Sequence, residues 1–483
     1  DEAIALYQQS IDLFLKHFGN DFPGTNHSYR AMAKALAQQG AYQRSIEYLQ
    51  QTLDLLARNF GNNHPFTGAT YQQLASVHLK QHQFEAALEA IEHGYSALLK
   101  ESIEKEQAHS PDAYSDQQVL LDLVREEARI LEAKYHVSED LADLELALST
   151  LRRAIDFIDQ IRKGFILDDS KLLLQEEAAA TFEQAISASF KLHVQTGEDK
   201  YLDDMFEFME KSKATLMAET LQSNALSNIQ GIPDSVLVEE SSIKRKISFV
   251  ESQLTGTDIN IDSIQNELFI LRRLYDTLAE HIAETYPKYY QLKYQVDTKK
   301  LDDVKLMLQP QQAVLTYFLG HDYWYVLAIA QNGINAMQID SAKIKEADVI
   351  KFREMLADAQ YRWNNQLANR LFSTLVADPL QGLGGFDRLI VVPDGLLGHI
   401  SFDALTLNPS DKPIYAVTEY AISYTPSVTM LGLSETYQQT SNSYYGFAPV
   451  NYQNELSSLL GSQQEVNMAA DLYNGKSYLS LIH

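Results

Sequence analysis

The first hundred residues repeat their pattern of hydrophobic and polar positions at a fixed interval. The run Phe18-Gly19-Asn20-Asp21-Phe22-Pro23 returns 42 residues later as Phe60-Gly61-Asn62-Asn63-His64-Pro65. The same offset pairs Tyr29 with Tyr71 and Ala33 with Ala75. Such self-similarity is typical of stacked supersecondary units that cannot bury their apolar faces alone. The pattern predicts pairs of helices, and residue 1 falls in the second helix of a pair, so we expect the first helix of that pair upstream.

Helical spacing continues, less regularly, after residue 100. Apolar residues recur three and four positions apart with few Gly or Pro, over residues 112–135, 139–163, 168–196 and 199–222. Gly231-Ile232-Pro233 interrupts this pattern. Residues 234–254 and 261–285 then predict two long amphipathic helices joined at Thr255-Gly256-Thr257-Asp258. We therefore expect repeats over 1–100, further helical repeats over 101–230 and a helical hairpin over 231–287.

From residue 288 the pattern changes to that of β-strands. Strands rich in β-branched and aromatic residues are expected at 313–319, 323–330 and 334–339, separated by the turn signals Gly320-His321-Asp322 and Asn332-Gly333. Helical spacing returns at 343–359 and 364–376, followed by an apolar strand at 388–392. Residues 288–483 therefore predict an α/β sheet domain behind an α-helical solenoid.

The most informative run is LIVVPDGLLGHISFDAL at 389–405. Its apolar strand ends at Pro393-Asp394-Gly395, which predicts a tight turn, and a second buried segment follows. This run resembles the CHAT domain, a caspase-like, separase-related cysteine-peptidase module usually found behind tetratricopeptide (TPR) repeats. Further stretches fit that family in the same order, at 286–294, 313–329, 422–431, 445–450 and 465–479. The 42-residue units likewise resemble TPR helix pairs similar to those of kinesin light chain.

The CHAT resemblance implies a Cys–His dyad. A thiolate would attack the scissile carbonyl, and an imidazole would activate the thiol and protonate the leaving amine. In the family the histidine lies in a strand-end H-x-x-x-H-G segment, and the cysteine follows on the next strand. Ser480-Leu481-Ile482-His483 matches the first half of that segment, so both dyad residues are expected beyond His483. No catalytic residue is assigned, and a chain without cysteine is expected to be inactive.

The resemblance implies a regulated caspase-like cysteine endopeptidase of bacterial type, whose repeats bind a protein partner or substrate. A non-catalytic TPR–CHAT scaffold and a protease subunit of a larger RNA-guided effector complex remain as alternatives. The groove of stacked helix pairs suits an extended peptide or a partner helix. Its candidate lining residues are Asn26, Arg30, Lys34, Gln72 and Gln73.

Charge and composition narrow the class of partner. The chain carries 65 acidic and 39 basic side chains, a formal net charge of −26. This excess disfavours direct contact with nucleic acid or with anionic membranes. No apolar run approaches the ~20 residues of a membrane-spanning helix. The absence of cysteine excludes disulfides and thiolate metal sites and fits a cytoplasmic protein. We predict no metal or cofactor.

Two further sets of polar residues are interpreted as structural. His78 and His82 stand four apart, as helical metal ligands can, but the sequence nearby offers no third ligand. His399, Ser401 and Asp403 have the composition of a catalytic triad. Spaced two apart, they are expected to share one strand face in parallel rather than converge.

Overall fold

The computed structural model describes most of the chain. The described residues are 2–100, 111–164, 168–224, 233–253, 270–271, 273–275, 277–278, 281–286, 299–340, 343–358, 361–410, 412–431, 445–452, 460–472 and 476–482. They divide into two compact units, residues 1–429 and residues 430–483. The expected domain limits near residues 100, 230 and 287 stay predictions.

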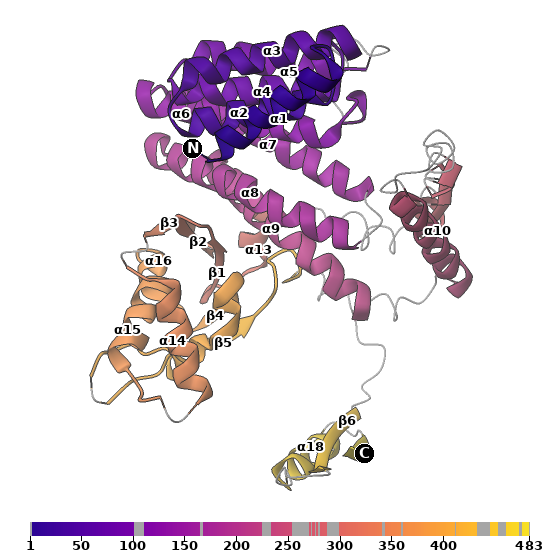
Figure 1. Cartoon of the computed structure of the whole chain (residues 1–483). Coiled ribbons are helices and arrows are strands. Elements are labelled where there is room, and N and C mark those ends of the chain that lie inside the picture. The colour runs from indigo at the N-terminus through magenta and orange to yellow at the C-terminus, as the bar shows by residue number, and fades with distance from the viewer. Residues whose placement is uncertain are drawn as a thin grey trace. The chain divides into compact units, whose positions relative to one another are not determined.

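The predicted solenoid of helix pairs is confirmed. After α1 (Glu2–Phe18), each helix packs against the next one along the chain. The successive pairs are α2 (Thr25–Gln38) with α3 (Tyr42–Phe60), α4 (Pro65–Lys80) with α5 (Phe84–Leu98), α6 (Gln117–Ser138) with α7 (Leu141–Gly164), and α8 (Asp168–Thr196) with α9 (Lys200–Asn224). Figure 1 shows them stacked from indigo to magenta.

Small residues sit where the helices come close, as the repeat pattern predicts. Ala33 and Ala75, one repeat apart, are both fully buried. The Ser45 hydroxyl donates to the Ala33 carbonyl at 2.7 Å, which joins α3 to α2. At Gly94 an added Cβ would lie 2.5 Å from Leu123 Cδ2, a distance that real Cβ atoms do not adopt. Glycine therefore permits this contact between α5 and α6 without a shift of the Leu123 side chain.

A small cluster forms around α10 (Asp234–Gln253). Ile243, Ile247 and Val250 pack with Leu278 and Ile282. The predicted helical hairpin over 231–287 stays a prediction. The expected connection at 255–258 and most of the second helix lie outside the described residues.

The four predicted strands form a mixed five-stranded sheet together with a fifth strand that was not predicted. Its order is β3 (Gly333–Asp340), β2 (Tyr323–Ala330), β1 (Gln312–Leu319), β4 (Arg388–Val392), β5 (Ala421–Tyr424). β1 pairs antiparallel with β2 and parallel with β4, while β5 lies parallel to β4 at the edge. The fold class expected from the sequence, a helical solenoid followed by an α/β sheet domain, is confirmed. The short helix α13 (Leu301–Met307) leads into the sheet.

Different helices cover the two faces of the sheet. One face packs Leu315, Tyr317 and Val326 against Phe352 and Leu371, which belong to α14 (Glu346–Ala357) and α15 (Asn365–Phe372). A π-helical turn (Ser373–Ala377) and α16 (Asp378–Leu380) continue α15. The opposite face, which includes Thr316 and Tyr325, contacts α8 and α9. Figure 1 shows α8 and α9 along one side of the sheet and α14 to α16 along the other.

The turn and the buried segment expected after β4 are present, but the segment forms 3-10 helices rather than a strand. Asp394 stays extended, and Gly395 adopts a φ of +46°, a left-handed value that favours glycine. The chain then forms short 3-10 helices at Gly395–His399 and Phe402–Ala404. These turns bury Leu397 and Phe402 in the sheet core while His399 stays exposed.

The second compact unit contains a parallel strand pair. β6 (Tyr445–Tyr452) pairs with β7 (Lys476–Ile482), and α18 (Leu460–Leu472) packs on both. The pairing has an irregularity between Pro449 and Asn451. A crossover helix between adjacent parallel strands is the β-α-β arrangement. His483, the expected leading histidine of the dyad segment, lies outside the described residues.

Candidate functional site

A buried lysine joins the helical repeats to the centre of the sheet. Lys213 lies on α9, and its residue is only 4% exposed. Its Nζ donates to Thr316 Oγ1 at 2.6 Å and to the Val392 carbonyl at 3.4 Å. Thr316 and Val392 face each other in the register of β1 and β4. The ammonium therefore lies across the parallel strand pair at the last residue of β4.

Two opposing effects act on the pKa of Lys213. Burial lowers the pKa of Lys213, because its charged form loses hydration. The negative charges of Glu210 and Asp394 act against this by favouring the ammonium. Asp394 follows directly after β4, and its Oδ2 accepts the backbone N–H of Leu319 at 2.7 Å. The Pro393-Asp394-Gly395 motif thus ties the ends of β1 and β4 together and places a carboxylate near the lysine.

Glu210, one turn before Lys213 on α9, holds the last residues of the first compact unit. Its side chain is buried, and Oε1 accepts the N–H of Val428 at 3.2 Å. Oε2 accepts both the N–H and the hydroxyl of Thr429, each at 2.8 Å. Three donors satisfy this buried carboxylate, as a charge removed from water requires. The chain continues from there into the second unit at Met430.

Other side chains of α9 fix it to the preceding repeat. Arg152 on α7 pairs with Asp204 and, at 2.7 Å, with Glu207. Lys211 pairs with Glu207 at 2.9 Å and with Asp156 of α7 at 3.2 Å. Burial raises the pKa of Glu207, but hydrogen bonds from Arg152 and Lys211 outweigh it and lower that pKa overall. α9 is therefore held by ion pairs on the repeat side and by Glu210 and Lys213 on the sheet side.

α8 makes a second set of contacts with the sheet. Glu183 Oε1 accepts the N–H of Asp322 at 3.0 Å, in the turn between β1 and β2. A Cβ added to Gly320 in this turn would lie 2.4 Å from the same carboxylate oxygen. Phe190 meets Tyr325 edge to face, with ring centroids 5.8 Å apart. The helix pair α8–α9 therefore contacts the sheet at both the β1–β2 turn and the end of β4.

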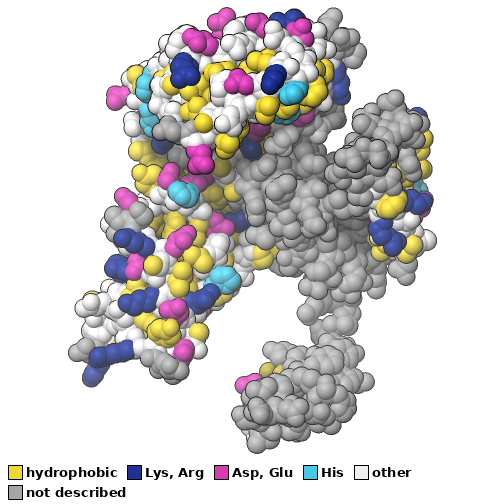
Figure 2. Space-filling view, viewed as in Figure 1, with side chains coloured by type: hydrophobic (Ala, Val, Ile, Leu, Met, Phe, Trp, Pro, Cys, Tyr) yellow, Lys and Arg dark blue, Asp and Glu magenta, His cyan; other side chains and the backbone are white. Residues whose placement is uncertain are grey.

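The candidate groove residues fall into different environments. Asn26 is buried, and its amide donates to the Pro23 carbonyl at 2.9 Å. Arg30 on α2 donates to Gln73 on α4 at 3.2 Å, and burial lowers the pKa of Arg30. Lys34 is exposed and Gln72 is half-buried. The structure thus brings Arg30 and Gln73 together across adjacent repeats, and a partner-binding role for these residues stays a prediction. Figure 2 shows acidic, basic and apolar side chains interspersed on the visible face of the repeats.

The histidine pair does not have the geometry of a metal site. α4 ends at Lys80, and His82 adopts a left-handed φ of +56° beyond it. His78 Nδ1 instead lies 2.8 Å from Gln83 Oε1. Among the described residues, no group of three or more His, Cys, Asp or Glu side chains could hold a metal ion.

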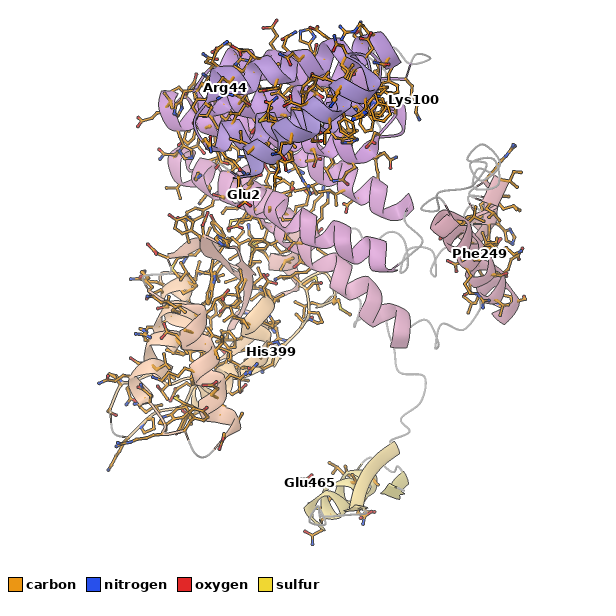
Figure 3. The ribbon with its side chains drawn as sticks, viewed as in Figure 1. Glu2, Arg44, Lys100, Phe249, His399 and Glu465 are labelled. Atoms are coloured by element: carbon orange, nitrogen blue, oxygen red, sulfur yellow. The ribbon has the colours of Figure 1, made fainter. Side chains whose placement is uncertain are left out.

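The set at 399–403 also differs from the shared strand face expected for it. These residues lie in consecutive 3-10 turns because the chain curls to bury Phe402. Ser401 donates to Asp403 at 3.3 Å, and Tyr424 of β5 donates to the same oxygen at 2.8 Å. His399 is exposed near β4 and β5, as Figure 3 shows. Ser401 and Asp403 are therefore joined to a tyrosine that the sequence did not indicate.

The sequence held one overlooked signal for the buried lysine. Leu202, Met205, Phe206 and Met209 form the buried stripe of α9, and Lys213 occupies the next position of that stripe. A charged residue at a core position requires a partner outside its own helix. The identity of that partner depends on tertiary contacts that local periodicity does not contain.

The fold and the contacts of α8 and α9 with the sheet, which we call the junction, define a helical-repeat protein. Its last described repeat pair, α8–α9, packs on a mixed sheet. Within this chain, the tetratricopeptide repeat family matches residues 24–100 and the CHAT domain matches residues 365–480. The chain therefore contains a TPR region followed by a CHAT domain.

Solved structures of repeats resemble the chain only distantly. TPR-like repeats of a kinesin light chain from Podosopora anserina share 19% identity, with a TM-score of 0.30, and the match covers 45% of this chain and 87% of that one. A second crystal structure of those repeats, in a form that carries one substitution, shares 17% identity, with a TM-score of 0.24, over 42% and 91% of the two chains. No curated protein matches the chain. None of the described helices has the length and apolarity needed to cross a bilayer.

Proposed function

We propose that the intact protein is a regulated caspase-like cysteine endopeptidase whose TPR repeats bind a protein partner or substrate. The CHAT match over residues 365–480 supports the peptidase class. The 483 residues contain no cysteine, so the proposal assigns the thiol nucleophile and its histidine to sequence beyond His483. A reduced cytoplasm would keep such a thiol active.

The observation that carries regulation is the double attachment of α9. In a solenoid each repeat contacts its neighbours, so a partner that changes the packing of one pair strains the next. Arg152 and Lys211 fix α9 to α7, and Glu210 and Lys213 connect α9 to the sheet and to Thr429. A partner on the repeats would then shift the equilibrium of the peptidase domain by its differential affinity for two arrangements.

The test uses the protein extended past His483 until it includes the expected histidine and cysteine. It is incubated with candidate partner proteins, with and without iodoacetamide, and cleavage is followed by mass spectrometry. We expect partner-dependent cleavage that the alkylating agent abolishes. Stable binding without cleavage would instead support the alternative of a non-catalytic scaffold. The absence of cysteine from these residues favours that alternative.

The variant Lys213→Met examines the coupling separately from the chemistry. It removes the contact with Thr316 and leaves the proposed dyad untouched. We expect it to bind the partner normally while cleavage no longer depends on that partner. Cleavage that still depends fully on the partner would show that another route connects the repeats and the sheet.

The remaining alternative is a protease subunit of an RNA-guided complex. In such a complex, the net charge of −26 on this chain favours binding of the nucleic acid by the partner rather than by this chain.

A further inference from the structure

Among the described residues of the first compact unit, the edge strand β5 pairs on one side only, with β4. Ala421 donates its N–H to Asp387 at 2.7 Å, and Thr425 donates to Val391 at 3.1 Å. Because alternate residues of a parallel strand bond to one neighbour, the N–H and C=O groups of Ile422 and Tyr424 point away from β4. These backbone groups are a template for another strand.

This edge strand is short, with four residues, but no side chain or bulge protects it. Natural edge strands are commonly guarded by lysine, proline or a bulge. Ala421-Ile422-Ser423-Tyr424 contains neither lysine nor proline, and its register with β4 is continuous. An unguarded edge in an otherwise ordinary sheet indicates a place where another chain segment is received.

A cavity of about 410 Å³ lies beside this edge and supplies side-chain chemistry. Val417 and Ile422 contribute apolar surface to its lining, and Asp403 and Glu419 contribute carboxylates. Val417 in this lining is 58% exposed, and Tyr424, outside the cavity on β5, is 47% exposed, so the apolar surface extends along the edge. The lining therefore combines apolar contact area with negative charge.

The hydrogen bonds of Tyr424 preserve that charge. The phenol donates to Asp403 Oδ2 at 2.8 Å and accepts the Phe402 N–H at 2.9 Å. Burial, followed by the hydrogen bond to Asp403, raises the pKa of Tyr424 to about 12. The phenol thus stays neutral at physiological pH and donates its hydrogen bond to the Asp403 carboxyl group.

We propose that β5 and this cavity bind an extended segment of a protein partner, in which a basic side chain lies among apolar ones. The partner backbone adds a strand beside Ile422 and Tyr424, and its Lys or Arg lies against Asp403 and Glu419. A second copy of this chain fits poorly, because the same two carboxylates and a net charge of −26 on each copy would repel each other. The inference goes beyond the proposed peptidase function and requires no nucleophile.

The binding experiment uses the 483-residue chain and a defined set of labelled peptides. The set consists of fluorescein-labelled nonapeptides of alternating Thr and Val, in which one Arg occupies each position in turn, and a matched set has Glu in place of Arg. Fluorescence anisotropy measures binding. We expect at least one Arg peptide to bind and its Glu counterpart to bind about two- to fivefold more weakly, as for an exposed charge pair. Absence of binding by every Arg peptide would overturn the proposal.

Two substitutions and one control assign the binding to this edge. Glu419→Lys should weaken binding of the Arg peptide about two- to fivefold. Glu47→Lys, an equally exposed charge reversal on α3, should leave it unchanged. Ile422→Pro removes only an outward N–H and should also weaken binding, provided that its circular dichroism matches the parent chain. Equal affinities for parent, Glu419→Lys and Glu47→Lys would overturn the proposal without requiring the proline variant to fold.

Hydrogen exchange observes the added strand directly. The outward amides of Ile422 and Tyr424 should exchange rapidly in the free chain and become protected when the Arg peptide is present. The inward amide of Ser423 should change little, because it faces β4 in both states. Slow exchange at both outward amides in the free chain would show that a second copy or this chain's own later residues already occupy the edge, and would refute the proposal.

Discussion

The Nζ atom of Lys213 lies 2.6 Å from Thr316 Oγ1, a contact between residues 103 positions apart in the sequence. It joins the last helix of the described repeats to the central strand of the sheet. Because a buried ammonium loses its hydration, this contact also affects stability in a way that can be measured.

Lys213→Met should raise the free energy of unfolding at neutral pH by about 1 kcal/mol. Methionine fills a similar volume without a charge to desolvate, and such replacements of buried charges are often stabilising. Urea unfolding followed by circular dichroism measures the change. A loss of several kcal/mol would show that the ammonium is held by stronger pairing than its two hydrogen bonds and two nearby carboxylates provide.

The pH dependence of stability should differ between the parent and Lys213→Met. Burial lowers the pKa of Lys213 below its ordinary value of 10.5. The unfolded chain therefore binds more protons than the folded chain between the lowered pKa and 10.5, and stability rises with pH across that interval. We therefore expect the free energy of unfolding of the parent to increase relative to that of Lys213→Met as pH rises toward 10.5. Parallel urea curves at all pH values would contradict this.

Glu210→Gln should destabilise the first compact unit by about 2 kcal/mol. The amide keeps only one acceptor oxygen, so a buried N–H of Val428 or Thr429 loses its partner. Chemical denaturation gives the change, and hydrogen exchange should become faster at those two residues. Glu239→Gln, at an exposed position of α10, is the matched control and should be neutral. Equal stability of the two variants would show that the Glu210 carboxylate does not hold Val428 and Thr429.

Gly94→Ala should lower the free energy of unfolding by about 1–3 kcal/mol through overpacking. The new Cβ would meet Leu123 Cδ2 at 2.5 Å. Combining it with Leu123→Ala should cost less than the sum of the two single changes, because the second removes the clash. Gly385→Ala, which has nothing within 4 Å of its added Cβ, should be nearly neutral. Additive effects in the double variant would contradict the close approach of α5 and α6.

Asp403→Asn should lower the pKa of Tyr424 from about 12 but not to its ordinary value of 10.0. Burial is the larger cause of the raised pKa and remains, whereas the hydrogen bond to a carboxylate is lost. Difference absorbance against Tyr424→Phe isolates the titration of this one phenol. An unchanged titration in Asp403→Asn would mean that the bond between Tyr424 and Asp403 is absent in solution.

Much of the fold follows from local patterns. The strands at 313–319, 323–330 and 388–392 are recognisable because short apolar runs rich in branched and aromatic residues end at turn signals. The helix pairs follow from the 42-residue repeat, in which small residues such as Ala33 and Ala75 recur at the contacts between helices. Periodicity determines which elements form, because it records which side of each element is buried.

The junction could not be read in the same way. The pairing of Lys213 with Thr316 depends on which helix covers the second face of the sheet, and no local pattern encodes that choice. The turns at 395–404 were misjudged because the burial of Leu397 and Phe402 resembles that of a strand when only the sequence is considered. Tyr424 was overlooked because its contact with Asp403 joins residues 21 apart.

The coverage of the sheet by α8 and α9 has a practical consequence for the design of truncated variants. Val314, Leu327 and Ile329 are fully buried on the sheet face that also carries Thr316 and Tyr325. A fragment expressed from residue 299 onward would expose this apolar surface and would therefore tend to aggregate. Truncations that are meant to stay soluble should begin before Asp168 and carry the last helix pair along.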